Sequence, residues 1–247
     1  RLVELAIVVF YGLKINRQVR FRFVNLFARN RLLFRDFLKY SIPVTANEML
    51  WGLGVSMNSL VIGHMGQAAV AANSAAQVVR QLATVVSFGI ANAAAIILGK
   101  AIGGGREDLA EVYGKRLVRL TLAAGAVGAA VVLAVRPLVL SVMNFSGESA
   151  GYLSFMMFVM SYFVIAQAMN TTLIVGVFRA GGDAKIGLLF DVGSMWFGSI
   201  LLGSIAAFVL HLSLPVVYVL LMSDELIKIP LSLWRYRKKI WLKNITR

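Results

Sequence analysis

The chain has 247 residues, of which 59% are hydrophobic and 15% charged, and its formal net charge is +14. Soluble domains are about 45–50% apolar, so this composition excludes an ordinary soluble fold. Because the chain contains no cysteine, disulfides, thiolate metal sites and cysteine nucleophiles are excluded as well.

Apolar stretches long enough to cross a bilayer, about 20 residues each, follow one another along the chain. A shorter apolar run, 2–13, precedes them and begins abruptly, without an initiator Met or the basic region of a signal peptide. We expect 1–13 to be the end of a transmembrane helix. The full-length candidates are 37–62, 71–102, 117–142, 152–178, 186–210 and 215–233. The predicted fold class is therefore all-α integral membrane, with a six-helix lobe over 37–235.

The positive charge is concentrated in alternate segments, which the predicted topology places on one side of this lobe. All of the 25 Lys and Arg residues except Arg1, Arg80 and Arg136 lie in four segments: 14–39, 100–119, 179–185 and 228–247. Basic loops face the cytoplasm by the positive-inside rule. We therefore expect a multi-pass protein of the inner membrane with a cytoplasmic C-terminus. The lipid bilayer explains the charge, and no nucleic-acid partner is expected.

Two basic segments flank the lobe. Residues 14–36 interleave Arg with Phe and Leu, a mixture that can lie in the headgroup layer; a basic connector without specific lipid contacts is the alternative. In either case 14–36 is predicted to be a cytoplasmic linker. Residues 236–247 are predicted to be a basic cytoplasmic tail.

Glu48 is the clearest ionisable residue inside a predicted crossing, where a charge costs roughly 2.5–3.5 kcal/mol. It belongs to a polar stripe at i+3/i+4 spacing, whose other members are Ser41, Thr45, Gly52, Ser56 and Ser59. A stripe of small residues can also be a helix contact, but a contact needs no carboxylate. We interpret Glu48 as an ion-coupling residue, with Pro43 as a nearby hinge.

The second crossing has a polar side that we expect to face water. It includes Asn73, Gln77, Arg80, Gln81, Thr84 and Asn92. Arg80 can line a pathway, pair with a carboxylate, or snorkel to the outer surface. The sequence leaves these three interpretations open.

Two further crossings carry acidic residues. Asp191 lies beyond the first turn of the fifth crossing, which favours a second ion-coupling role over simple complementarity to the helix dipole. Asp224, Glu225 and Lys228 interrupt the last crossing. The i,i+4 spacing of Asp224 and Lys228 favours mutual neutralisation over a role in transport.

The fourth crossing places polar residues together without an acid, among them Asn170 and Thr171. Such oxygen ligands with a carboxylate suit Na⁺, whereas a carboxylate alone suits H⁺; the sequence does not choose between them. No firm metal site is predicted, and Glu48 is the candidate for Na⁺. The predicted cavity-lining residues are Thr45, Trp51, Asn58, Asn73, Gln77, Arg80, Asn170 and Thr171.

Neither histidine has catalytic or zinc-binding spacing. His64 and His211 both fall in or beside predicted outer loops, far apart in sequence. No catalytic residue, enzymatic activity or cofactor is predicted, apart from Na⁺ or H⁺ as a coupling ion.

Three segments resemble the C-terminal half of a MATE (multidrug and toxic compound extrusion) transporter. They are 40–51 (YSIPVTANEMLW), 99–105 (GKAIGGG) and 178–183 (FRAGGD), and 223–228 (SDELIK) with 233–235 (LWR) resembles the last helix of bacterial members. Each glycine motif is weak alone. Their order and spacing across six helices make the resemblance strong.

This resemblance implies a twelve-helix protein with two pseudo-symmetric lobes, of which the chain is helices 7–12 plus the tail of helix 6. It implies an N-terminal lobe as partner, and antiport in which Na⁺ or H⁺ enters while a small organic cation or amphipathic compound leaves (multidrug efflux). Glu48 matches the helix of the family's coupling carboxylate, although it follows the proline more closely than in some members. The acid that some members carry on helix ten is missing from 152–178, and Asp191 is our hypothesis for its replacement.

There are two alternatives, one within transport and one in a different functional class. A lipid-linked saccharide flippase of the same superfamily would be expected to have a more basic cavity than a lone Arg80 provides. A non-transporting structural or channel subunit is the second alternative. An intramembrane enzyme is disfavoured, because no Ser/His, His/His or paired-carboxylate constellation lies at membrane depth.

Overall fold

The computed structural model describes residues 2–12, 31–143, 145 and 147–243. They belong to two compact units, 1–39 and 40–247. Most of the predicted linker 14–36, and the last four residues of the predicted tail 236–247, lie outside the described residues. The first unit contains α1 (Leu2–Phe10), a mostly apolar helix with no buried residue.

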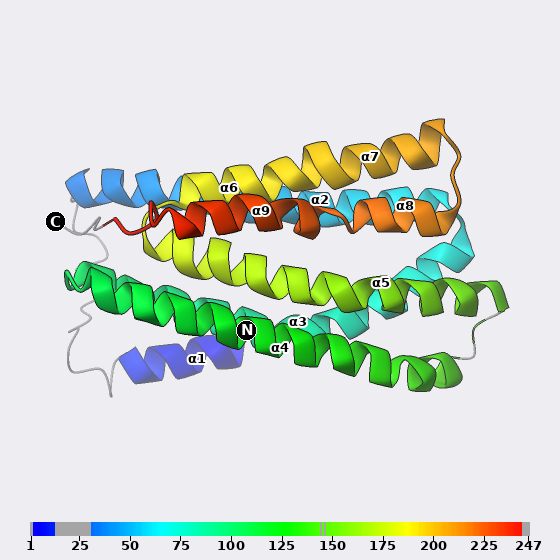
Figure 1. The fold of residues 1–247 in the computed structure, drawn as a ribbon, viewed down its shortest axis with the longest axis horizontal. Coiled ribbons are helices and arrows are strands. Elements are labelled where there is room, and N and C mark those ends of the chain that lie inside the picture. Colours follow the sequence, from blue (N-terminus) through cyan, green and yellow to red (C-terminus); the bar gives the residue numbers. More distant parts are fainter. Residues whose placement is uncertain (1, 13–30, 144, 146, 244–247) are drawn as a thin grey trace. The chain divides into compact units, whose positions relative to one another are not determined.

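The second unit arranges its described residues in six helical rods, and the predicted all-α membrane fold is confirmed (Figure 1). α2 (Arg31–His64) begins in the first unit. The next rods are α3 (Gln67–Gly103), α4 (Glu107–Val142), and α5 (Gly147–Thr171) continued by the π-helix η3 (Thr172–Phe178). The fifth rod joins α6 (Ala184–Gly193), η4 (Ser194–Ile200), α7 (Leu201–Ser204) and η5 (Ile205–Val209). The sixth consists of α8 (Leu214–Leu221) and α9 (Asp224–Arg237).

The helices differ from the predicted spans mainly at their ends. α2 begins at Arg31 instead of 37, and α4 begins at Glu107 instead of 117, because the helices continue past the apolar stretch. Four rods are long and apolar enough to cross a membrane: Gln67–Gly103, Glu107–Val142, Gly147–Phe178 and Ala184–Val209. The last crossing is not the continuous helix that we expected over 215–233, since it breaks between Leu221 and Asp224.

α5 is the central helix of the second unit. It packs against α3 and α4 on one side and against α8 and α9 on the other (Figure 1). Glycines on α4 allow this close packing: a Cβ atom at Gly125 would lie 2.9 Å from the Cβ of Ala168, and one at Gly128 would lie 2.8 Å from the carbonyl oxygen of Ala83. Small residues let membrane helices approach closely in this way.

Two apolar clusters fill the second unit, and a polar level separates them. One cluster contains Leu153, Val164 and Tyr218, and the other contains Leu98, Phe178 and Trp241. Along α5 the clusters meet at Gln167, and along the sixth rod they meet at Asp224, Glu225 and Lys228, all of which are buried. The polar side chains of the lobe are therefore concentrated between its ends.

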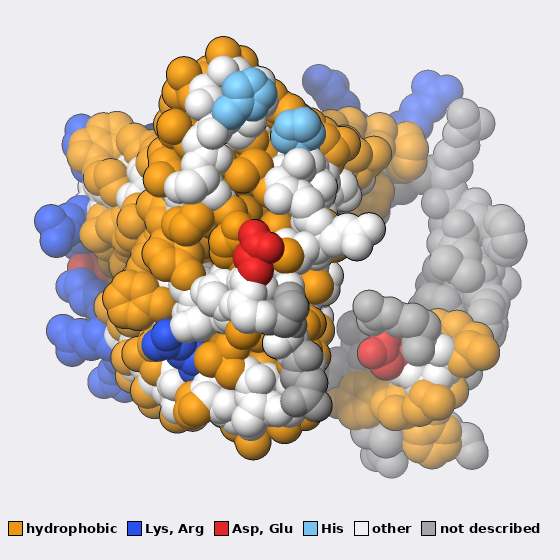
Figure 2. Space-filling view, turned by 90° about the vertical axis from the view of Figure 1, so that its right-hand side faces the viewer, with side chains coloured by type: hydrophobic (Ala, Val, Ile, Leu, Met, Phe, Trp, Pro, Cys, Tyr) orange, Lys and Arg blue, Asp and Glu red, His pale blue; other side chains and the backbone are white. Residues whose placement is uncertain are grey.

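The two ends of the second unit differ in charge. The end with the α2–α3, α4–α5 and α7–α8 connections presents mainly hydrophobic and uncharged side chains (Figure 2). At the other end, Arg235 donates to Asp183 through Nε (2.7 Å), and Lys239 pairs with Glu111 (2.6 Å). Trp241, in the predicted tail, is 1% exposed. The beginning of the tail therefore packs against the lobe.

The contact of Gly128 gives a stability test. We expect Gly128→Ala to lower the free energy of unfolding by about 1–3 kcal/mol, because the added methyl overpacks the contact between α4 and α3. Gly89→Ala is the control, since its Cβ would meet no atom of the described residues within 4 Å. Thermal unfolding of the full-length protein in detergent measures both. Equal stability of the two variants would contradict the packing described.

Candidate functional site

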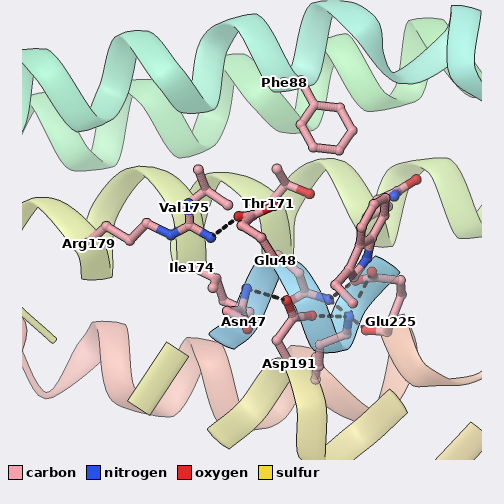
Figure 3. A pocket seen from close by; sticks show the side chains of 13 residues that line it. Asn47, Glu48, Phe88, Thr171, Ile174, Val175, Arg179, Asp191 and Glu225 are labelled. Atoms are coloured by element: carbon pink, nitrogen blue, oxygen red, sulfur yellow. Dashed lines mark hydrogen bonds and ion pairs between the residues drawn. The ribbon is translucent and has the colours of Figure 1, made fainter. Parts of the chain in front are cut away.

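A cavity of about 60 Å³ lies at the polar level of the second unit. Residues of α2, α3, α5, η3, α6 and α9 line it, together with Arg179 just after η3 (Figure 3). Its polar lining consists of Asn47, Glu48, Gln167, Asn170, Thr171, Arg179, Asp191, Glu225 and Lys228, and its apolar lining of Trp51, Phe88, Ile174 and Val175. The cavity therefore combines charged groups with aromatic and aliphatic surface.

The ammonium group of Lys228 lies among three carboxylates. Its Nζ atom is 2.8 Å from Oδ1 of Asp191, 2.8 Å from Oε1 of Glu225 and 3.1 Å from Oδ2 of Asp224. The side chain of Lys228 is 1% exposed, and those of Asp224 and Glu225 are 5% and 6% exposed. We call these four residues the lysine cluster. With three acids and one base, its fully ionised form carries excess negative charge.

Two amides fix the lysine cluster to the neighbouring helices. Nδ2 of Asn47 on α2 donates to Oδ2 of Asp191 (3.1 Å). Nδ2 of Asn170 on α5 donates both to Oε2 (2.8 Å) and to the main-chain oxygen (2.7 Å) of Glu225. Four helices, α2, α5, α6 and α9, are thus connected through polar contacts at one level. Figure 3 shows Asn47 and Asp191 pointing toward each other beside Glu225.

The break in the sixth rod creates the local geometry of the lysine cluster. Because α9 starts at Asp224, Asp224 and Glu225 lie in its first turn, where the helix dipole favours acidic side chains. Lys228 follows at i+4 and i+3, the spacings that bring side chains together on a helix. The fifth and fourth rods contribute π-helices, η4 and η3, which begin just after Asp191 and Asn170. Such segments are frequent at functional sites.

Glu48 has a different environment from the lysine cluster. Its Oε1 atom accepts a hydrogen bond from Nη2 of Arg179 (2.6 Å), and its side chain is 58% exposed. It borders the same cavity (Figure 3). The rest of its polar stripe, including Thr45, lies on a largely exposed face of α2. The buried face of α2 presents Asn47 and Asn58 instead.

A second, smaller cavity, of about 20 Å³, adjoins the lysine cluster on the side of Arg80. Its lining includes Asn58, Gln77, Arg80, Trp51, Asp224 and Glu225. The guanidinium carbon of Arg80 is 5.7 Å from the centre of the Phe163 ring, and its buried Nε atom has no hydrogen-bond partner among the described residues. Of the three interpretations of Arg80, lining a polar cavity is the one that this position matches.

The structure brings most of the predicted site residues to these two cavities. Glu48, Asp191, Trp51, Asn170 and Thr171 line the first, and Asn58, Gln77, Arg80 and again Trp51 line the second. Thr45 is exposed, and Asn73 is buried; neither lines either cavity.

The predicted site residues did not include Asn47, Gln167, Arg179, Glu225 and Lys228, whose polar side chains line the first cavity. The i,i+4 spacing of Asp224 and Lys228 predicted their pairing. It did not reveal that Asp191, on another helix, shares the same ammonium group. Within the described residues, no group of His, Cys, Asp and Glu is arranged to hold a metal ion.

Comparison with known proteins identifies a protein family and several solved structures that are similar to this chain. The MatE family model matches residues 44–205. An outward-facing multidrug resistance MATE family transporter of the MOP superfamily superposes with a TM-score of 0.82 at 16% identity, over 99% of this chain and 55% of that chain. A MOP superfamily transporter from Pyrococcus furiosus gives 0.82 at 18% identity, over 98% and 55%. An inward-facing multidrug resistance MATE family transporter gives 0.70 at 16% identity, over 99% and 57%.

The structural likeness concerns the fold and one half of those proteins. This chain spans about half the length of the structures that it matches. No match was found among curated proteins.

The different burial of the two ion-pair sites predicts different effects on stability. Lys228→Met leaves the buried carboxylates of Asp224 and Glu225 and the partly buried one of Asp191 without their counter-charge, and we expect it to lower the free energy of unfolding by about 3–5 kcal/mol. Glu48→Gln breaks an exposed pair, for which we expect about 0–1 kcal/mol. Thermal unfolding of both full-length variants measures the difference. A Lys228→Met variant as stable as Glu48→Gln would show that the lysine cluster is not a buried ionic unit.

Proposed function

The chain belongs to the MatE family of transporters, and on that premise we propose that it is the C-terminal lobe of a cation-coupled antiporter. The complete protein exports cationic or amphipathic organic compounds in exchange for Na⁺ or H⁺. The observation that carries this proposal is the cavity in which Asp191 and Glu48 lie together with Glu225 of the lysine cluster.

The chemistry of the cavity supports a cationic substrate. Its excess of carboxylates attracts positive charge, and this attraction is stronger where water is scarce. Trp51 and Phe88 supply aromatic surface beside these acids, and aromatic faces bind organic cations. An organic cation can thus be held by charge and ring contacts together.

The same carboxylates supply the coupling. When Glu48 or Asp191 binds H⁺ or Na⁺, the negative charge of the cavity falls and an organic cation is held less tightly. Occupation by one species therefore weakens binding of the other, which is the reciprocal coupling that exchange needs. Glu48 and Asp191 are the proposed ion-coupling residues.

The proposal includes an arrangement in the cell. The protein lies in the inner membrane with the C-terminus of this lobe in the cytoplasm, in accordance with the basic segments near Lys239 and Arg235. The exposed polar stripe of α2 faces the N-terminal lobe, which completes the substrate path. The partners are small organic cations and lipid, without nucleic acid, and no cofactor beyond the coupling ion takes part.

A lipid-linked saccharide flippase is the less favoured alternative. Its phosphate-bearing substrate would need unpaired basic groups. Lys228 is surrounded by carboxylates, and Arg179 pairs with Glu48. Of the basic residues that line the two cavities, only Arg80 resembles an unpaired basic group.

Dye efflux by the full-length protein in vesicles tests the proposal, with Na⁺ and pH gradients imposed separately. We expect efflux of a cationic dye under at least one gradient. We expect Glu48→Gln and Asp191→Asn to reduce it by about tenfold or more, a loss that corresponds to about 1.4 kcal/mol, because each variant removes a group that binds the coupling ion.

Glu148→Gln is the matched control for these variants. Glu148 is an exposed acid at the start of α5 that accepts a hydrogen bond from Tyr152 and lines neither cavity. Dye efflux by the Glu148→Gln variant should equal that of the wild type. If efflux by Glu48→Gln and Asp191→Asn were also unchanged under both gradients, the assignment of the coupling residues would be wrong.

A further inference from the structure

We propose that Lys228 acts as a tethered cation, whose ammonium group occupies the place of a free monovalent ion and restricts the lysine cluster to protons. The inference rests on the proposed function and deepens it by naming the coupling ion at this site. It assigns Lys228 a specificity-determining role and excludes Na⁺ as the ion bound among these carboxylates.

The geometry of Lys228 matches that of a coordinated cation. Its Nζ atom donates hydrogen bonds to Oδ1 of Asp191 (2.8 Å) and Oε1 of Glu225 (2.8 Å), and it forms an ion pair with Oδ2 of Asp224 at 3.1 Å. A lysine ammonium has three donors and no acceptor, so it meets these oxygens as a bound cation would. With its side chain 1% exposed, the ammonium group is enclosed by these oxygens in place of water.

The wall of the cavity beside Lys228 contains further oxygen atoms without partners. Oδ1 of Asn47, Oε1 of Gln167 and Oδ1 of Asn170 are buried and accept no hydrogen bond among the described residues. These residues are 4%, 4% and 1% exposed and line the same cavity as Lys228. Carboxylate and amide oxygens are the ligands that hard cations prefer. The site therefore has the composition of a cation site, but the side chain of Lys228 reaches into it.

The charges around Lys228 favour the binding of a proton to one of the carboxylates. One ammonium group compensates only one of the three acids, and an uncompensated buried carboxylate is costly. The other charged groups that face the cluster are Arg80, which lines the second cavity with Asp224 and Glu225, and the paired Arg179 and Glu48 at the first cavity. The buried Tyr218 also interacts with Arg80.

Arg80 leaves at least one negative charge of the cluster uncompensated. A proton that binds a carboxylate oxygen converts it to a carboxylic acid and needs no space for a new ion. Its release restores the carboxylate, so the cluster exchanges a single proton without moving Lys228 out of its position.

The test removes the tethered cation while keeping the net charge of the cluster. In the double variant Lys228→Met, Asp224→Asn of the full-length protein, one positive and one negative charge disappear together. We expect the double variant to bind radioactive Na⁺ at least about tenfold more tightly than the wild type does. In vesicles, wild-type efflux should follow the pH gradient and ignore replacement of Na⁺ by choline, whereas the double variant should respond to Na⁺.

Lys115→Met, Glu111→Gln is the control, since it removes an i,i+4 lysine–acid pair that lines neither cavity and should leave Na⁺ binding unchanged. The inference is overturned if wild-type efflux is driven by a Na⁺ gradient at constant pH. It is equally overturned if the double variant folds, judged by its thermal transition, and binds no more Na⁺ than the wild type. If the double variant does not fold, the wild-type ion dependence decides.

Failure of the proposed function is distinguishable from failure of this inference. Wild-type protein that shows no dye efflux under either gradient contradicts the antiporter assignment. In that case the comparison of Na⁺ binding between the wild type and the double variant still decides whether Lys228 takes the place of a cation.

Discussion

The burial of Lys228 is the constraint on which the rest of the lobe depends. A charged side chain inside an apolar bundle is tolerated only when it is paired, so the helices that carry its partners must meet at one level. Asp191 brings α6 to α9, and Asn47 and Asn170 connect α2 and α5 to the same cluster. The apolar clusters on either side of this level can then pack without containing a charge.

Composition and apolar length were sufficient to predict the six rods, because a bilayer requires long apolar helices whatever their packing. They could not predict where each helix stops outside the apolar stretch, as the early start of α4 shows. The break before Asp224 was also missed, since neither glycine nor proline marks it. The sequence signal for this break was the adjacent acid pair Asp224 and Glu225, which suits the first turn of a helix. We interpreted the pair as an interruption within a continuous helix.

The site was predictable only where one helix carried the signal. Helical spacing correctly grouped Glu48 with its exposed stripe, but the buried face of α2 is set by contacts with other helices. Gly54, for example, leaves no room for a Cβ atom beside the side chain of Met195, so the face with Asn47 and Asn58 turns inward. The contact between Asp191 and Lys228 spans 37 residues. No local spacing encodes such a contact. Yet the contact of Asp191 with Lys228 is what extends the neutralised pair Asp224 and Lys228 into a cluster.

The two ion-pair sites of the first cavity differ in how easily they exchange partners. Glu48 and Arg179 pair at the open side, where an exposed ion pair contributes only about 0–1 kcal/mol, so another cation can replace Arg179 at little cost. The carboxylates around Lys228 are enclosed, and loss of their partner is far more costly. Because both sites border one cavity, a cation that enters at Glu48 meets a second group of acids whose positive partner is covalently attached. The positive partner of Glu48 can thus be exchanged at the surface of the cavity, whereas the ammonium group of Lys228 stays in place at the centre.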